Sequence, residues 1–164
     1  MLTRQLAEMV DEVVGIDTDG PSIELARSQA GSGEEYIHGD LFTHRFEPDS
    51  FDIVASVAML HHVDAEAGLE RMKELTRPGG TIALIGLART RLPHDIPWEL
   101  AGAVTTRVLK LSRTYWEHSA PIVWPPPTTH NEIRTIARRT LPGVHHRRHV
   151  LWRYSLVWTK PFGP

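Results

Sequence analysis

Apolar residues recur along the chain with two different spacings, and this predicts helices and strands in turn. Leu2, Leu6, Met9 and Val10 recur at helical spacing, so we expect the chain to open on an amphipathic helix. Residues 13–17 follow as a short β-branched run that ends in polar residues. Such a run is typical of a strand that is buried on both faces.

The same alternation continues through most of the chain. Further strands are expected at 36–38, 51–56 and 81–87, and further helices over 23–30, 65–75 and 131–141. The run Arg77-Pro78-Gly79-Gly80 predicts a type II turn before the strand at 81–87, because Pro and Gly occupy its two central positions. The runs 144–149 and 154–159 are close enough to form an antiparallel hairpin.

Regular alternation of this kind predicts an α/β fold. We expect a Rossmann-like, doubly wound and mainly parallel sheet with an antiparallel C-terminal hairpin strand, in one domain over residues 1–164. The rhythm lapses over residues 88–129, which we interpret as a lid-like insertion. Its aromatic residues suit either a flat apolar substrate or simple anchoring to the core; they are Trp98, Tyr115, Trp116 and Trp124.

Composition narrows the protein class. The chain has 164 residues, 41% of them hydrophobic and 23% charged, which is ordinary for a soluble globular domain. The net charge of -2 gives no overall attraction to nucleic acid or to an anionic membrane. Cysteine is absent, which excludes disulfides, thiolate zinc sites and a cysteine nucleophile, and fits a reducing cytoplasm.

Asp17 is the first candidate for chemistry because it ends a predicted buried strand. In doubly wound folds an acid at this position accepts hydrogen bonds from both ribose hydroxyls of a nucleotide cofactor. A glycine-rich turn normally lies about 20 residues before that acid. A position about 20 residues before Asp17 would lie before Met1. We therefore expect the chain to begin after the first strand and its glycine turn.

Four short motifs occur in an order and spacing that resemble one family. They are Val14-Gly15-Ile16-Asp17; Gly39-Asp40; Phe51-Asp52-Ile53-Val54 followed by Leu60-His61-His62-Val63; and Leu75-Thr76-Arg77-Pro78-Gly79-Gly80. Together they resemble class I S-adenosylmethionine-dependent methyltransferases that act on small molecules, of the methyltransferase type 11 kind. The chain departs from that family in lacking the Gly-x-Gly loop, which in the family holds the methionine part of the cofactor.

The resemblance implies cofactor contacts at two strand ends. Asp17 would hold the ribose of S-adenosylmethionine, with Thr18 beside the adenine. Asp40 would accept from the adenine amino group, and Leu41 would pack on the ring face. The residue types agree, since an anion suits an exocyclic amine and an aliphatic side chain suits an aromatic ring. Asp40 also suits a turn that caps its own backbone.

The resemblance also implies a site at the end of the strand at 51–56. Ser56 and Val57 would lie beside the cofactor and the reacting methyl group. His61 and His62 would follow in the same loop, where an imidazole can take a proton from the methyl acceptor or can simply hydrogen-bond locally. The expected catalytic residues are therefore His61 and His62, and the expected partner is a small-molecule methyl acceptor.

The segment His145-His146-Arg147-Arg148-His149 is the remaining unusual feature. It mixes basic and imidazole side chains as RNA-binding segments do, but a solvated hairpin at a sheet edge explains it more simply. No carboxylate or thiolate stands at ligand spacing beside these histidines. We therefore expect no metal, no nucleic acid and no membrane as partners.

Methyl transfer from S-adenosylmethionine is the leading functional hypothesis, and two alternatives stay open at this point. A nicotinamide-dependent oxidoreductase would use the same strand-end acid. A truncated, catalytically impaired methyltransferase remnant is the other alternative, since a sheet without its central strand loses core packing.

Overall fold

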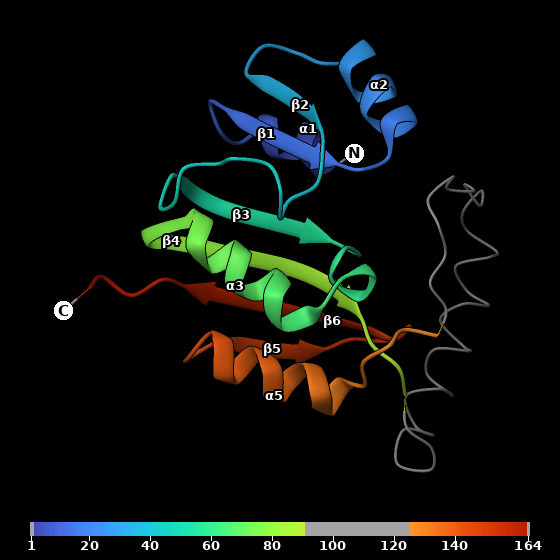
Figure 1. Ribbon diagram of the computed structural model, residues 1–164, viewed down its shortest axis with the longest axis vertical. Coiled ribbons are helices and arrows are strands. Elements are labelled where there is room, and N and C mark those ends of the chain that lie inside the picture. The colour runs from blue at the N-terminus through green and yellow to red at the C-terminus, as the bar shows by residue number, and fades with distance from the viewer. Residues whose placement is uncertain (1, 91–124, 164) are drawn as a thin grey trace. The chain divides into compact units, whose positions relative to one another are not determined.

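The structure is a computed structural model that describes residues 2–90 and 125–163 (Figure 1). It divides into two compact units, unit 1 over Met1–Phe46 and unit 2 over Glu47–Pro164. Both contain parallel strands with helical connections, as the alternation predicted. The expectation of one domain over residues 1–164 stays a prediction.

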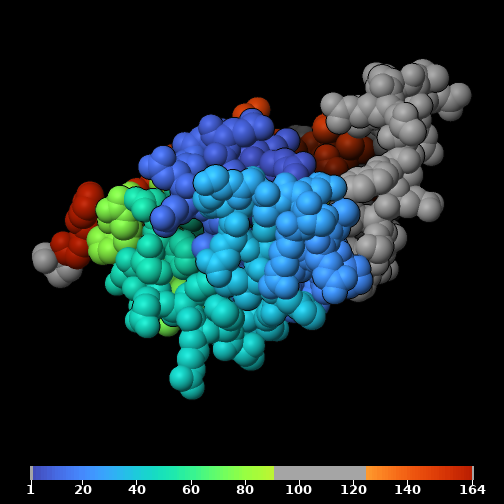
Figure 2. Space-filling model, turned by 90° about the horizontal axis from the view of Figure 1, so that it is seen from above, coloured from blue at the N-terminus to red at the C-terminus, as the bar shows by residue number. Residues whose placement is uncertain are grey.

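Unit 1 is a small α/β unit. Its elements are α1 (Leu2–Ala7), β1 (Val13–Asp17), α2 (Gly20–Ser28) and β2 (Glu34–His38). Strands β1 and β2 pair in parallel, with Asp17 opposite His38 at their carboxyl ends. The buried residues of this unit are Ile23, Ala26 and Tyr36. Figure 2 shows the atoms of unit 1 in blue and light blue, packed against one another.

Two apolar residues of unit 1 do not have the predicted burial. Met9 is 77% exposed, because α1 ends at Ala7 and the chain turns with the Met9 N–H donating to the carbonyl of Leu6. Leu25 in α2 is 47% exposed. Helix α2 begins three residues before the predicted start, because the Asp19 side chain caps it by accepting from the backbone N–H of Ser22.

Unit 2 contains the larger sheet. Its elements are β3 (Phe51–Val57), the 3-10 turn η1 (Leu60–His62), α3 (Ala65–Leu75), β4 (Thr76–Leu87), α5 (His130–Thr140), β5 (His145–Arg148) and β6 (Arg153–Thr159). The strand order is β3-β4-β6-β5. Strands β3 and β4 are parallel, whereas β6 is antiparallel to both of its neighbours (Figure 1). The predicted α/β sheet with an antiparallel C-terminal hairpin is therefore confirmed.

The core of unit 2 lies between one face of this sheet and the helices α3 and α5, which lie on the same side in Figure 1. Side chains from all three layers meet in one cluster; among them are Leu69 and Met72 of α3, Ile133 and Ala137 of α5, and Ile82, Leu84, Tyr154, Leu156 and Trp158 of the sheet. Helix α5 begins with a capping box, in which Thr129 and Glu132 each accept from the other's backbone N–H.

The opposite face of the same sheet is apolar and largely open. Ile53, Val57, Ile85 and Val157 are 48%, 52%, 43% and 44% exposed. Strand β3, which the sequence predicted at 51–56, is therefore not fully buried. The reason is that both α-helices of the described part of unit 2 pack against the other face.

The predicted type II turn lies inside strand β4 rather than before it. Gly79 has φ +78°, as the third position of such a turn requires. Thr76 and Thr81 are five positions apart, whereas their partners Phe51 and Ile53 are only two apart on β3, so the turn bulges out of the ladder. Gly80 has no room for a side chain, because a Cβ there would stand 2.9 Å from the carbonyl oxygens of Arg77 and Asp52.

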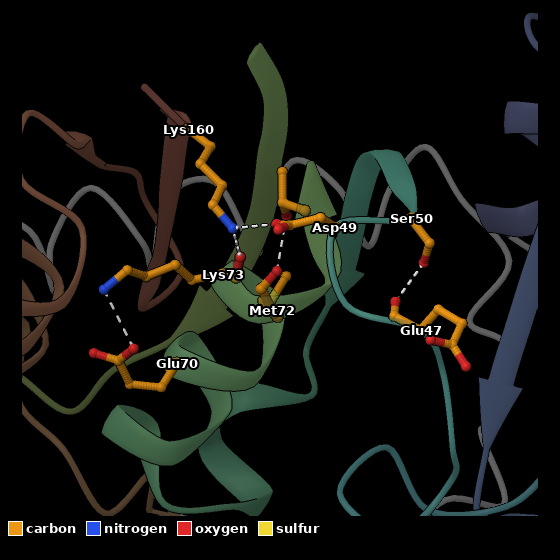
Figure 3. A network of polar contacts seen from close by, with 8 residues as sticks. Glu47, Asp49, Ser50, Glu70, Met72, Lys73 and Lys160 are labelled. Atoms are coloured by element: carbon orange, nitrogen blue, oxygen red, sulfur yellow. Dashed lines mark hydrogen bonds and ion pairs between the residues drawn. The ribbon is translucent and has the colours of Figure 1, made fainter. Parts of the chain in front are cut away.

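Lys160 joins distant segments at the amino end of β3. Its Nζ donates to Asp49 Oδ1 at 2.6 Å and to the carbonyl of Lys73 at 2.9 Å (Figure 3). The backbone N–H of Asp49 in turn donates to the carbonyl of Glu74. These contacts connect the segment after β6 to the end of α3 and to the start of β3.

Candidate functional site

The two acids expected to bind the cofactor lie at the same end of the β1–β2 pair. Asp17 is the last residue of β1, and Asp40 follows β2 by two residues. The N–H of Gly39 donates to the carbonyl of Asp17 at 2.9 Å, so the backbone just after β2 is in direct contact with this strand end. Both carboxylates are exposed.

Each carboxylate uses one oxygen to hold its own turn. Asp17 Oδ1 accepts from the N–H of Asp19 at 2.9 Å, and Asp40 Oδ1 accepts from the N–H of Phe42 at 2.6 Å. The local capping role considered for Asp40 therefore does occur. The second oxygen of each carboxylate makes no hydrogen bond within the described residues, and it remains available to a ligand.

A histidine that the sequence did not single out lies beside these acids. His38 ends β2, and its Nε2 stands 3.1 Å from the carbonyl oxygen of Thr18. A Cβ at Gly20 would lie 3.2 Å from the same ring, so glycine there makes room for the imidazole. Thr18 is exposed and Leu41 is half-buried, at the positions where adenine contacts were expected. The position of His38 two residues before Asp40 was the only sequence signal.

The other expected site residues belong to unit 2, where they follow the carboxyl end of β3. Ser56 and Val57 pair with Leu84 and Ile85 of β4, and the N–H of Ala58 closes the ladder onto the Ile85 carbonyl at 2.8 Å. Ala58 has φ +56°, a left-handed conformation that is uncommon outside glycine. This turn directs the chain away from the sheet and into η1.

His61 and His62 lie in η1 and differ in environment. His61 is buried at 7% exposure, and its Nδ1 has no hydrogen-bond partner within the described residues. Burial, followed by the nearby charge of His62, lowers the pKa of His61 below its ordinary value, so His61 is neutral at pH 7. His62 is exposed, and its ring centroid lies 4.1 Å from that of His61.

The expected site residues thus form two groups, Asp17 to Leu41 in unit 1 and Ser56 to His62 in unit 2. Each group occupies the carboxyl ends of parallel strands, where α/β folds bind ligands. The aromatic residues Trp98, Tyr115, Trp116 and Trp124, on which the lid interpretation depended, lie outside the described residues. Within the described ranges, no group of His, Asp and Glu side chains is arranged to hold a metal ion.

Comparisons with known proteins agree with this arrangement. Two solved structures share the fold over 97% and 98% of this chain: an S-adenosylmethionine-dependent methyltransferase from Mesorhizobium loti (TM-score 0.64, 17% identity, 85% of that chain) and the N-methyltransferase NodS from Bradyrhizobium japonicum WM9 in complex with S-adenosyl-L-homocysteine (TM-score 0.62, 15% identity, 72% of that chain). The fold is therefore the Rossmann-like fold of methyltransferases.

Sequence comparison gives the family. A family described as "Methyltransferase domain" matches residues 1–84. An uncharacterized methyltransferase of Mycobacterium tuberculosis is 34% identical over 163 residues, which are 98% of this chain and 82% of that relative. The chain belongs to the methyltransferase family, and it is an enzyme of that class. In the portions of the chain that the structure describes, no helix has the length and apolar composition that a membrane span requires.

Proposed function

We propose that the protein transfers a methyl group from S-adenosylmethionine to a small-molecule acceptor. One observation carries this proposal: Asp17 and Asp40 extend from the same end of two paired parallel strands, and each has a carboxylate oxygen that its own turn does not use. Membership of the methyltransferase family favours this reaction over nicotinamide-dependent oxidoreduction, which would use the same acid.

The residues of unit 1 fit a nucleoside-bearing cofactor. The free oxygen of Asp17 suits a ribose hydroxyl, and that of Asp40 suits an adenine amino group, because both ligand groups donate hydrogen bonds to an anion. Leu41 is half-buried and offers an aliphatic surface to a ring, and Thr18 extends from the same strand end. The NodS structure contains S-adenosylhomocysteine, the product form of this cofactor.

When bound, S-adenosylmethionine supplies a sulfonium-activated methyl group. Such a transfer needs mainly in-line approach and orientation of the acceptor. We propose that Ser56 and Val57 line the place where the methyl group and the acceptor meet. The end of β3 is the part of unit 2 that corresponds to a ligand-binding strand end, which supports this assignment.

We propose further that the histidine pair after β3 takes the acceptor's proton. His62 is exposed and is the member of the pair that can contact an acceptor. His61 is buried and neutral, and its ring lies beside that of His62 at a centroid distance of 4.1 Å. His62 is thus the proposed general base, and His61 is the proposed positioning residue.

The cofactor proposal is tested by measuring the affinity of the full chain for S-adenosylhomocysteine in a ligand-observed NMR titration. Asp17→Asn removes charge-assisted hydrogen bonds of about 1.5–3 kcal/mol, and should weaken binding roughly 10- to 150-fold. The matched control is Asp11→Asn, which removes an exposed carboxylate just before the amino end of β1 and should leave the affinity unchanged.

Two results would count against this function. Equal affinities of the two variants would remove Asp17 from the site. Saturable binding of a nicotinamide dinucleotide, with none of S-adenosylhomocysteine, would assign the strand end to another cofactor.

The cysteine-free composition supports a cytoplasmic location for this reaction.

A further inference from the structure

One row of side chains crosses the unit 2 sheet on its open face, the face that α3 and α5 do not cover. The ladder aligns four residues, one from each strand in the order β3-β4-β6-β5 (Figure 1): Val57, Ile85, Ser155 and Arg147. Successive side chains of a strand point to opposite faces. The next residue, Tyr154, belongs to the core with α3 and α5, so Ser155 and its partners in the row point to the open face.

The row changes from apolar to cationic across the sheet. Val57 and Ile85 are exposed apolar side chains. Arg147 is exposed at the other end, and the exposed Arg153 lies two residues before Ser155, on the same face of β6. Opposite residues of an antiparallel pair have Cβ atoms about 5 Å apart, and residues two apart on a strand are about 7 Å apart. Both arginine side chains are long enough to bring a guanidinium group to the hydroxyl of Ser155.

These two arginines have no acidic neighbour in their part of the chain. The last Asp or Glu of the sequence is Glu132, well before β5 and β6. The ion pairs among residues 2–90 and 125–163 involve other basic residues, and neither Arg147 nor Arg153 belongs to one. Two cationic side chains that flank one hydroxyl on an exposed face attract an anion.

Ser155 is oriented by a histidine from the adjoining turn. His149 Nε2 lies 2.8 Å from Ser155 Oγ, and the His149 N–H donates to the carbonyl of Arg153 at 2.8 Å. When Nε2 carries the proton it donates to Oγ, and the hydroxyl proton of Ser155 is left for a further acceptor. The turn between these residues is costly, because Leu151 and Trp152 have φ values of 59° and 60°. Residues held in such conformations cluster at ligand sites.

The row lies near the edge of the sheet that the proposed methyl transfer uses. Strands β3, β4 and β5 run in the same direction, because β6 is antiparallel to both β4 and β5. Val57 ends β3, and Arg147 is the last residue but one of β5, so both lie near carboxyl ends, where α/β folds bind ligands. Two strand spacings of about 4.8 Å put Val57 roughly 10 Å from Ser155.

We infer that Arg147, Arg153 and Ser155 bind an anionic group of the methyl acceptor. The acceptor is then an amphipathic acid, whose apolar body covers Ile85 and whose reacting end lies at Val57. Guanidinium groups match the oxygens of a carboxylate or a phosphate with paired N–H donors, and burial of the apolar body adds to the affinity. This inference rests on the proposed function, which places methyl transfer at the end of β3.

The test compares two phenols of the same shape, para-hydroxyphenylpropanoate and its uncharged amide. Their affinities for the full chain are measured by ligand-observed NMR without cofactor, and we expect the acid to bind more tightly than the amide. Arg147→Gln and Arg153→Gln should each weaken binding of the acid about fivefold, the strong end of what an exposed ion pair contributes. Binding of the amide should stay unchanged in both variants.

Arg139→Gln is the matched control, because it removes the same charge from α5, on the covered side of the sheet, where Arg139 pairs with Glu66. It should leave both affinities unchanged. Equal weakening of the acid by all three variants would show a general charge effect and overturn the inference. A variant that weakens the acid and the amide equally would show that its arginine supports the structure and not an anion, which would overturn the inference as well.

The same measurements separate this inference from the proposed function. If the chain binds S-adenosylhomocysteine but binds the acid and the amide equally, methyl transfer stands and the anionic acceptor is excluded. If the acid binds through both arginines but S-adenosylhomocysteine does not bind, the anion site stands and methyl transfer is excluded. The phosphonate analogue of the same phenol tells the two anions apart, because the ligand that binds more tightly identifies the group.

Discussion

Replacing Gly86 by alanine tests the packing between β4 and β6. Gly86 lies opposite Tyr154 in the ladder, and the tyrosine is buried at 1% exposure. A Cβ at Gly86 would stand 2.8 Å from Tyr154 Cε1 and closer still to its Cζ and hydroxyl oxygen, well inside normal contact. His146 stacks on the Tyr154 ring, so an outward movement of the tyrosine would break this contact.

The expected cost follows from two opposing effects. Overpacking of a filled core costs about 1–3 kcal/mol. The smaller conformational freedom of alanine in the unfolded chain offsets roughly 0.4–1 kcal/mol of this. The middle values of these two ranges are about 2 and 0.7 kcal/mol, so we expect Gly86→Ala to lower the free energy of unfolding by about 1 kcal/mol, seen as a lower urea midpoint with an unchanged slope.

Two further variants make the reasoning refutable. Gly163→Ala adds the same methyl group where nothing lies within 4 Å, so it should leave the midpoint unchanged. Tyr154→Leu makes room at the crowded position, so Gly86→Ala should cost less in that background than in the unmodified chain. If Gly86→Ala is as stable as the unmodified chain, or if the two substitutions are strictly additive, the proposed clash does not occur.

Two other predictions concern the histidines. His62→Ala should lower the rate at which S-adenosylhomocysteine is formed, measured with a phenolic acceptor, by about 10²- to 10⁴-fold without changing cofactor affinity. An unchanged rate, or an equal loss of rate in the exposed control His145→Ala, would exclude the base role. Burial lowers the folded-state pKa of His61 and His146 below the unfolded value of about 6.5. The contribution of the two neutral imidazoles to the free energy of unfolding is therefore fully present above that value, and it is lost as the pH falls through the lowered pKa values. Urea midpoints should therefore be lower at pH 5.5 than at pH 7.5, and less so after His61→Asn; equal midpoints would contradict this.

Local signals in the sequence were sufficient for most elements of the fold. The predicted helix at 65–75 matches α3, because its apolar period starts directly after Asp64, whose side chain caps the helix by accepting from the N–H of Ala67. The turn at Gly79 was predictable because proline and glycine stand at the positions that a type II turn requires. In both places the information lies within a few residues.

Burial was less predictable because it depends on which face of a strand is covered. Phe51, Ile53 and Ala55 form the apolar side of their strand, and the sequence alone does not show that Ile53 stays 48% exposed. Met9 fits the helical stripe of its neighbours but follows the end of α1. Such outcomes depend on packing between distant segments, which apolar spacing does not encode.

The sequence likewise predicted some features of the candidate site and not others. Asp17 was identifiable from the sequence because it ends a β-branched run, and the structure places it at the end of β1. The stacking of His146 on Tyr154 depends instead on the register between β5 and β6, which joins segments that the sequence alone does not align. The sequence showed a basic segment there but not this contact.

The position of β6 has a consequence for synthesis of the protein. Among the strands that the structure describes, β6 comes last in the chain, yet it lies between β4 and β5 and contributes Tyr154, Leu156 and Trp158 to the core. On the ribosome, the apolar faces of α3 and β4 therefore lack part of their cover until residues 153–159 have been translated. The nascent chain is a candidate for chaperone binding throughout that interval, because the core of unit 2 is incomplete until β6 has been made.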